Sequence, residues 1–371
     1  MRNNDNQQVF FALLRAGLWE KEVRLLPFGR VDYQDVLRLA EEQSVIGLIA
    51  AGMEHVSDTR IPKMDLLQAV GHTLQIEDQN KAMNHFIGVL TTQLRNEGIS
   101  SVLVKGQGIA QCYERPMWRT SGDIDLLLDR ESYEKAKKVL GRRALHENRE
   151  GLYNFHQAIT INGWEVELHG TMRTNLGTRI DNELDSIQAK CIQNNEYRMW
   201  ENEGESIILP SPDNDVVFVF THILQHFFRG GIGLRQIFDW CRLLWTYREQ
   251  LDLQLLESRL RRMGLVTEWK AFGMLAVEWL GMPAEAMPFI DVSYRKKARR
   301  ILRLVMETGN FGHNRDVSYH EKYPFIIYKA ISFWQTTKDS CRHFLIFPKD
   351  SIRIWWRLMV SGMGRAVRGI T

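Results

Sequence analysis

The chain has 371 residues, which is enough for two or three domains with a sizeable apolar core. Its net charge of +3 is too small to indicate nucleic-acid binding by itself, and its apolar and charged fractions are ordinary for a globular protein. Four widely spaced cysteines without a CxxC pair predict reduced, buried thiols. No visible signal peptide and no apolar run of membrane-spanning length predict a cytoplasmic protein with no integral membrane segment.

The N-terminal quarter has the periodicity of helices. Apolar residues recur at helical spacing over residues 31–51 and 66–96, and Gly98 follows the second stretch at the position of a C-terminal cap. We therefore expect an N-terminal helical region over residues 1–97.

A strand, a glycine turn and a short helix are predicted next. Residues 99–104 are rich in β-forming side chains and lead into Lys105-Gly106-Gln107-Gly108 and a helical stretch at 109–113. Glycine lets backbone N–H groups approach an anion, and a helix N-terminus adds a favourable dipole. The segment therefore predicts a phosphate-binding turn in which Lys105 supplies a point charge. The alternative is an ordinary turn, since glycines commonly follow strands.

Asp123 and Asp125 are the most informative residues of the chain. They lie two apart at the start of an unbroken leucine run, which predicts a buried strand with both carboxylates on one face. Two adjacent anions repel unless a cation lies between them, and Mg²⁺ favours one or two carboxylates together with substrate phosphates. We therefore expect a phosphate-processing metal site, with a solvated pair that caps a turn as the alternative. A helix over residues 131–140 is expected to follow.

A β-hairpin is predicted over residues 156–169, because Asn162-Gly163 matches a two-residue type I′ turn. One face of this hairpin then carries three cross-strand pairs, which are His156 with His169, Ala158 with Glu167, and Thr160 with Glu165. Beside an Asp-x-Asp strand, an acid of the hairpin is the expected third metal ligand or base. The alternatives are a solvated outer face and a zinc site of His156, Glu167 and His169.

The remainder of the chain is predicted to be mostly helical. A proline-rich stretch at 209–213 opens it, and a Gly-, His- and Asp-rich loop is expected over 309–323. Helical periodicity predicts helices over residues 213–228, 234–247, 253–263 and 294–307.

Two pairs of polar residues stand four apart on these helices. His222 and His226 suit substrate-side hydrogen bonding better than metal binding, because their spacing places no third ligand. Arg235 and Asp239 suit an intrahelical ion pair near the cleft.

The C-terminal segment is locally basic. Its Lys and Arg residues, interleaved with Trp355 and Trp356, are Arg342, Lys349, Arg353, Arg357, Arg365 and Arg368. Such a segment can face RNA or a membrane. We favour an amphipathic helix that packs its tryptophans onto the body of the protein.

The order of these motifs resembles the nucleotidyltransferases of the DNA polymerase β superfamily. More narrowly, it resembles a largely uncharacterised bacterial nucleotidyltransferase group. The matching residues are Lys105-Gly106, Arg119, Asp123-Ile124-Asp125, His156, Val166-Glu167-Leu168-His169, Leu209-Pro210, His222, His226, Arg235 and Asp239. The resemblance extends over about two thirds of the chain and fades after about residue 260.

This resemblance implies roles for individual residues. Asp123, Asp125 and Glu167 match the catalytic carboxylates that hold Mg²⁺ or Mn²⁺, and Glu167 also assists the attacking hydroxyl. The implied nucleotide-binding residues are Lys105, Gly106, Gln107, Arg119 and Ser121. The possible acceptor side comprises His156, His169, His222 and His226. The chain departs from the broad pattern by carrying Gln107 where a small hydroxyl residue is usual, and Glu167 where Asp is more frequent.

Arg119 has two interpretations. A planar guanidinium suits the oxygens of a phosphate tail or of leaving pyrophosphate. The alternative is an ion pair that holds the loop before Asp123.

The predicted fold class is therefore α+β. A small mixed β-sheet of the polymerase-β type, over residues 98–205, is expected between helical regions at 1–97 and 206–371. The implied function is metal-dependent transfer of a nucleoside monophosphate from an NTP to a hydroxyl of a small molecule, peptide, protein or RNA. A non-catalytic nucleotide- or partner-binding scaffold is the main alternative, and a metal-dependent phosphohydrolase is a third. Three retained carboxylates favour catalysis, because a retired site has little physical reason to keep like charges together.

Overall fold

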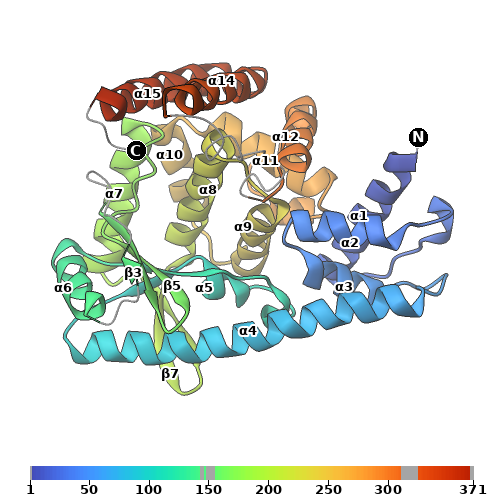
Figure 1. The fold of residues 1–371 in the computed structure, drawn as a ribbon, viewed down its shortest axis with the longest axis horizontal. Coiled ribbons are helices and arrows are strands. Elements are labelled where there is room, and N and C mark those ends of the chain that lie inside the picture. Colours follow the sequence, from blue (N-terminus) through green and yellow to red (C-terminus); the bar gives the residue numbers. More distant parts are fainter. Residues whose placement is uncertain (1, 143–145, 148–154, 311–324, 368–371) are drawn as a thin grey trace.

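The computed structural model describes residues 2–142, 146–147, 155–310 and 325–367. A small mixed sheet lies among helices, so the predicted α+β class is confirmed (Figure 1). The long helix α4 (Lys63–Asn96) passes beneath both the N-terminal helices and the sheet. Its 34 residues, at about 1.5 Å each, span roughly 50 Å, and they confirm the helix predicted over 66–96.

The N-terminal helices are α1 (Arg2–Trp19), α2 (Tyr33–Glu42) and α3 (Ile46–Glu54). The helical periodicity predicted over 31–51 corresponds to α2 and α3, which are separated at Ser44, where φ is 55°, a left-handed conformation that an α-helix does not contain. Helices α1 and α3 cross closely: a Cβ on Gly17 would lie 2.0 Å from the carbonyl oxygen of Leu48. Only glycine allows that approach.

The main sheet has five strands in the order β1-β2-β5-β4-β3. Their bounds are β1 (Val102–Val104), β2 (Asp123–Leu127), β3 (His146–Glu147), β4 (His156–Ile161) and β5 (Trp164–His169). The β2 and β5 strands pair in parallel, whereas the other neighbours are antiparallel. Within the β4–β5 hairpin, His156 lies opposite His169 and Ala158 opposite Glu167, which confirms the predicted register.

The two faces of this sheet differ in chemistry. Ile124, Leu126, Val166 and Leu168 are buried in one apolar cluster with residues of α4 and of α6 (Arg130–Gly141). Because side chains alternate along a strand, Asp123, Asp125 and Glu167 are directed to the opposite face. The acids therefore lie on the face opposite these helices, where Asp125 is buried and Asp123 and Glu167 are half-buried.

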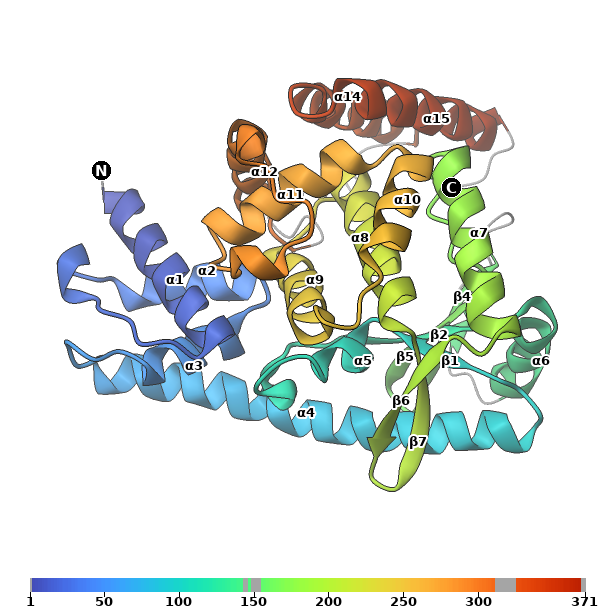
Figure 2. The ribbon, with the colours of Figure 1, turned by 180° about the vertical axis from the view of Figure 1, so that it is seen from behind.

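The rest of the chain adds one hairpin and a layer of helices, seen from behind in Figure 2. The elements are α5 (Gly106–Ala110), α7 (Thr178–Gln193), β6 (Tyr197–Asn202), β7 (Glu205–Pro210), α8 (Pro212–Arg229), α9 (Leu234–Tyr247), α10 (Leu253–Met263), α11 (Val266–Glu278), α12 (Arg295–Thr308), α14 (Phe325–Phe344) and α15 (Pro348–Val367). The four helices predicted between residues 213 and 307 are confirmed as α8, α9, α10 and α12. The loop predicted over 309–323 lies almost entirely outside the described residues.

The N-terminal and C-terminal helical regions share one apolar core. The indole of Trp19 donates to the carbonyl of Leu280 at 2.7 Å, and the Gln43 side chain donates to Val305 and accepts from the N–H of Leu234. The boundaries predicted near residues 97 and 205 therefore separate stretches of sequence whose helices pack together in space.

The C-terminal pair of helices differs from its prediction. Trp355 is half-buried, and its Nε1 donates to Thr337 at 3.3 Å. Trp356 is 64% exposed, so the expected packing of both tryptophans onto the body is wrong. Among the described residues, no helix is both long and apolar enough to cross a membrane. The four cysteines are free thiols; three are buried as predicted, whereas Cys341 is exposed.

Candidate active site

The parallel pairing of β2 with β5 brings the predicted acids together. Asp125 is in register with Glu167, and Asp123 lies two residues before Asp125 on the same face. One carboxylate oxygen from each of these three residues lies within 4.8 Å of the others. Glu165, in register with Asp123, is exposed and is not part of this group. The structure thus selects Glu167 over its neighbour as the third carboxylate.

The charges of the three acids are unequally compensated. Repulsion from Asp125, followed by burial, raises the pKa of Asp123 above its ordinary value, despite the opposing effect of Lys105. Burial alone would raise the pKa of Glu167 too, but hydrogen bonds from His156 and His169 hold that pKa far below its usual range. Glu167 is therefore firmly ionised, and Asp123 carries the uncompensated repulsion.

Two imidazoles contact the carboxylates. His156 Nε2 lies 3.0 Å from Glu167 Oε2, while His169 Nε2 lies 2.7 Å from Asp125 Oδ1 and 3.3 Å from Glu167 Oε2. Burial opposes protonation of His169, but its bonds to Asp125 and Glu167 raise its pKa overall. His156, Glu167 and His169 also bring ligand atoms within 4.8 Å of one another, so the zinc alternative retains a geometric basis.

Lys105 and Gly106 form the turn between β1 and α5. Lys105 has φ of 58°, Gly106 has φ of 42°, and the ammonium of Lys105 lies 2.6 Å from Asp125 Oδ1. Burial would lower the pKa of Lys105, yet the attraction of Asp125 raises it. Because α5 has only five residues, its dipole is small, and the expected anion-binding turn depends mainly on side-chain charge.

Gln107 is directed away from the acids. Its side chain is buried and donates to Asn80 Oδ1 of α4 at 2.6 Å and to Ser121 Oγ at 3.2 Å. The side chain thus ties the glycine turn to α4, and this placement differs from the predicted contact with a nucleotide. Ser121 also lies at the cleft, where its hydroxyl accepts from both Gln107 and Arg119.

Arg119 forms a buried ion pair, which was the second of the two roles considered for it. Its Nε and Nη2 each donate to Asp239 at 2.7 Å, and its Nη1 donates to Ser121. The hydroxyl of Tyr113 also donates a hydrogen bond to Asp239, at 2.8 Å. Burial would lower the pKa of Arg119, but Asp239 raises it, so the guanidinium stays charged. Two charges so deeply buried anchor the loop before β2 on α9.

Arg119→Lys is expected to destabilise the protein by about 1.5–3 kcal/mol, because an ammonium cannot reproduce both charged hydrogen bonds of the fork. Urea unfolding measures this loss. Arg173→Lys is the matched control: Arg173 makes the same two-pronged contact with Asp185, but both side chains are substantially exposed. An equal loss in both variants would contradict a special role for the buried pair.

Arg235 lies near the cleft, as predicted, but Asp239 bonds to Arg119 from another segment. Arg235 lines the cleft with Lys105 and Asp123, and its Nη1 donates to the carbonyl of Thr120 at 2.7 Å. Its charge also lowers the pKa of Asp123, which indicates proximity to the acids. Helical spacing suggested only a partner four residues away; contact with the loop before β2 depends on how α9 packs.

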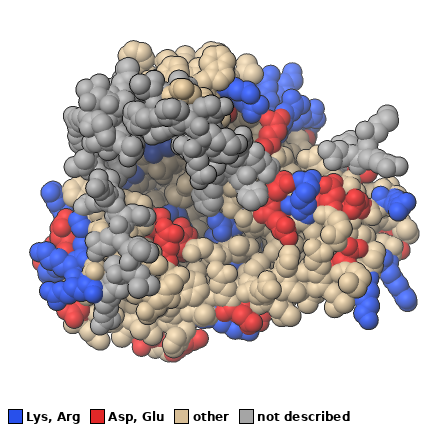
Figure 3. Space-filling model, in the orientation of Figure 1, with Lys and Arg blue, Asp and Glu red and all other residues tan. Residues whose placement is uncertain are grey.

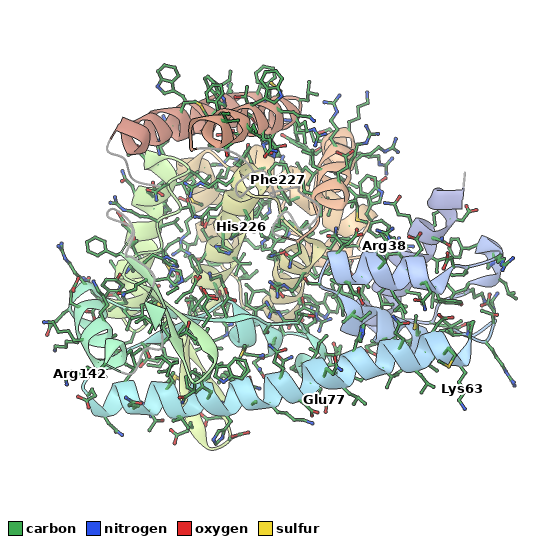
Figure 4. The ribbon with its side chains drawn as sticks, in the orientation of Figure 1. Arg38, Lys63, Glu77, Arg142, His226 and Phe227 are labelled. Carbon is green, nitrogen blue, oxygen red and sulfur yellow. The ribbon has the colours of Figure 1, made fainter. Side chains whose placement is uncertain are left out.

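His222 and His226 belong to α8, and His226 is labelled in Figure 4. Their Nε2 atoms lie 3.0 Å apart, so the pair hydrogen-bonds to itself, and His222 lines the cleft. Burial first, and then Lys105, lowers the pKa of His222 strongly and that of His226 to about 4. Both imidazoles are therefore neutral at physiological pH. They do not join the carboxylate group as ligands.

The cleft between the sheet and α8–α9 is narrow, with a cavity volume of about 50 Å³. Figure 3 shows a hollow on this face, with charged side chains of both signs at its edge. The acidic oxygens of the cleft, together with the basic groups of Lys105 beside them and of Arg235 on α9, can receive a metal-bound anionic ligand.

Comparison with known proteins agrees with this chemistry. A family described as uncharacterised nucleotidyltransferase matches residues 29–281. No curated protein matches the chain. The crystal structure of an antigenic nucleotidyltransferase-like protein from Paracoccidioides brasiliensis is similar over 57% of this chain and 95% of its own, with 14% identity and a TM-score of 0.33.

Proposed function

Because this chain belongs to the family of uncharacterised nucleotidyltransferases, we propose that it transfers a nucleoside monophosphate from an NTP to a hydroxyl-bearing acceptor. The observation that carries the proposal is the convergence of Asp123, Asp125 and Glu167 within 4.8 Å on the face of the sheet that borders the cleft. The parallel pairing of β2, which carries the two aspartates, with β5, which carries Glu167, also supports assignment to the DNA polymerase β superfamily.

The donor set fits Mg²⁺ or Mn²⁺. All three ligating groups are carboxylates, and hard oxygen ligands are those that these ions prefer. The same proximity to Asp125 raises the pKa of Asp123, and a bound cation would relieve this repulsion. Such an ion neutralises charge on the transferring phosphoryl group and lowers the pKa of the attacking hydroxyl.

The chain's own residues supply positioning and charge. Glu167 is kept ionised by His156 and His169, so it serves as a ligand rather than as a strong proton acceptor. Lys105 neutralises Asp125 when the phosphates are absent and lies at the cleft, within reach of a phosphate oxygen. Arg235 offers a second positive charge for the triphosphate tail. Arg119 acts indirectly by fixing the loop that leads into Asp123.

Incubation of the pure protein with each α-labelled NTP and Mg²⁺ in cell extract tests the proposal. We expect a labelled acceptor from the wild-type protein and none from Asp123→Asn. Release of free nucleoside monophosphate without an acceptor would favour the phosphohydrolase alternative. Metal-dependent NTP binding with no labelled product from any extract would favour the non-catalytic scaffold.

His222 and His226 are proposed to lie on the acceptor side. The carboxylates and the basic groups of the cleft account for the metal and triphosphate, whereas the neutral imidazole pair offers hydrogen bonds to an uncharged hydroxyl. Replacing both with Gln should reduce transfer about tenfold or more while sparing metal-dependent NTP binding. His85→Gln is the control, because His85 is an exposed residue of α4 that bonds to Glu203. Collapse of NTP binding would place the pair on the nucleotide side instead.

A further inference from the structure

The outer faces of α14 and α15 carry a concentration of exposed apolar side chains. Trp334 is 70% exposed and Trp356 is 64% exposed. In the described part of the chain, every Phe and Trp among the exposed large hydrophobic residues belongs to this pair of helices. We call this surface the C-terminal face; its apolar residues are Ile327, Phe333, Trp334, Phe344, Leu345, Ile352 and Trp356.

The exposure follows from how the two helices pack. His343 of α14, Ile354 of α15 and Phe347 between the helices are buried, and the rings of His343 and Phe227 of α8 have their centroids 4.8 Å apart. Figure 4 labels Phe227. Ile327 and Trp334 are seven residues apart and thus lie on one side of α14, whereas Ile352 and Trp356 share one side of α15. Both helices lie at the edge of the molecule in Figures 1 and 2, with no described element beyond them.

The same helices are strongly basic. From residue 325 to residue 367 the sequence has seven Lys and Arg residues and two Asp residues, a net charge of +5, so the rest of the chain carries −2. Lys338 and Lys349 are exposed beside the apolar residues. Of the two acids, Asp350 bonds to Arg353, and Asp339 lines a small internal cavity with His343. The C-terminal face therefore combines indole, aliphatic and ammonium groups.

We propose that the C-terminal face binds the surface of a bilayer that contains anionic lipids. Tryptophan rings favour the headgroup level of a membrane, aliphatic side chains insert below it, and Lys and Arg attract its negative charge. RNA binding would use the aromatic and basic residues of this face, but it would leave the aliphatic side chains of Leu345, Ile352 and Ile327 without a role. A second copy of the chain would bring two surfaces of the same positive sign together. The helices lie on the bilayer without crossing it.

This association does not depend on nucleotidyl transfer. The C-terminal face lies on α14 and α15, whereas the cleft is lined by the sheet, α8 and α9. Docking would hold the cleft close to the lipid surface, where an acceptor dissolved in or attached to the membrane is concentrated.

Flotation of the full-length protein with vesicles tests the proposal. We expect binding to phosphatidylcholine vesicles that contain phosphatidylglycerol, weaker binding to phosphatidylcholine alone, and weakening by salt. Trp334→Ser combined with Trp356→Ser should reduce partitioning about tenfold or more, since each exposed indole contributes apolar area to insertion. Lys338→Glu with Lys349→Glu should reduce binding to the anionic vesicles selectively.

Leu67→Ser with Leu74→Ser is the matched control, because both leucines are about half exposed on α4, away from the C-terminal face. Melting curves and light scattering accompany each variant; the tryptophan variant should melt as the wild type does, because its altered side chains are exposed. Equal vesicle binding by the tryptophan variant and the wild type would overturn the proposal. The proposal would also be overturned if the wild type formed a dimer and the two tryptophan substitutions made it monomeric. It would equally be overturned if the wild type bound RNA but not vesicles, and the same substitutions abolished the RNA binding.

Discussion

Asp123→Asn is expected to abolish the enhancement of NTP affinity by Mg²⁺ while leaving the protein as stable as the wild type, or more stable. Asp123 is one of three converging ligands, so the amide removes a metal ligand and its charge. Its pKa is raised in the folded state, chiefly by Asp125, which means that its ionised form costs stability at neutral pH. The neutral amide removes that cost. Loss of function with retained stability distinguishes a binding site from a structural ion pair.

Nucleotide titration with and without Mg²⁺, together with melting curves, measures both effects. Asp123 is preferred to Asp125 for this test because Asp125 bonds to Lys105 and His169, and its replacement would leave the buried Lys105 ammonium without the carboxylate that neutralises it. Asp78→Asn is the control, since it makes the same change on the exposed side of α4. Unchanged metal dependence in Asp123→Asn would remove this residue from the metal site, and with it the proposed function.

Glu167→Gln is expected to lower the rate of transfer by roughly two orders of magnitude or more, with a smaller effect on NTP binding. Glu167 is in register with Asp125 and is held ionised by His156 and His169, so its charge is available to a cation that bridges the strands. The amide keeps the size of the side chain but loses that charge. Steady-state transfer to the labelled acceptor and nucleotide affinity are the two measurements.

Glu165→Gln provides a matched control on the same strand. Glu165 is two residues from Glu167, on the same face, yet it is exposed and outside the carboxylate group. Its replacement should leave the transfer rate within about a factor of two of the wild type, because an exposed charge is well screened. If instead Glu165→Gln is inactive and Glu167→Gln is fully active, the third carboxylate has been assigned to the wrong residue.

Patterns of short range in the sequence determined the secondary structure and the list of candidate acids. The Asn162-Gly163 turn fixes the register of β4 with β5, because a two-residue type I′ loop leaves one pairing. Helical periodicity likewise placed α8, α9 and α10 nearly at their observed bounds. It did not show the break at Ser44, where one residue with positive φ divides a continuous apolar pattern into α2 and α3.

Only the tertiary structure decided which of these residues meet. The parallel pairing of β2 with β5 joins Asp125 to Glu167 across 42 positions of sequence, and no local pattern encodes that neighbour. Arg119 reaches Asp239 of α9, and Gln107 reaches Asn80 of α4, because desolvated polar groups take the partners that packing brings near. The outward position of Trp356 has the same origin: an amphipathic pattern shows that a helix has two faces, but the fit against α8 decides which apolar residues are covered.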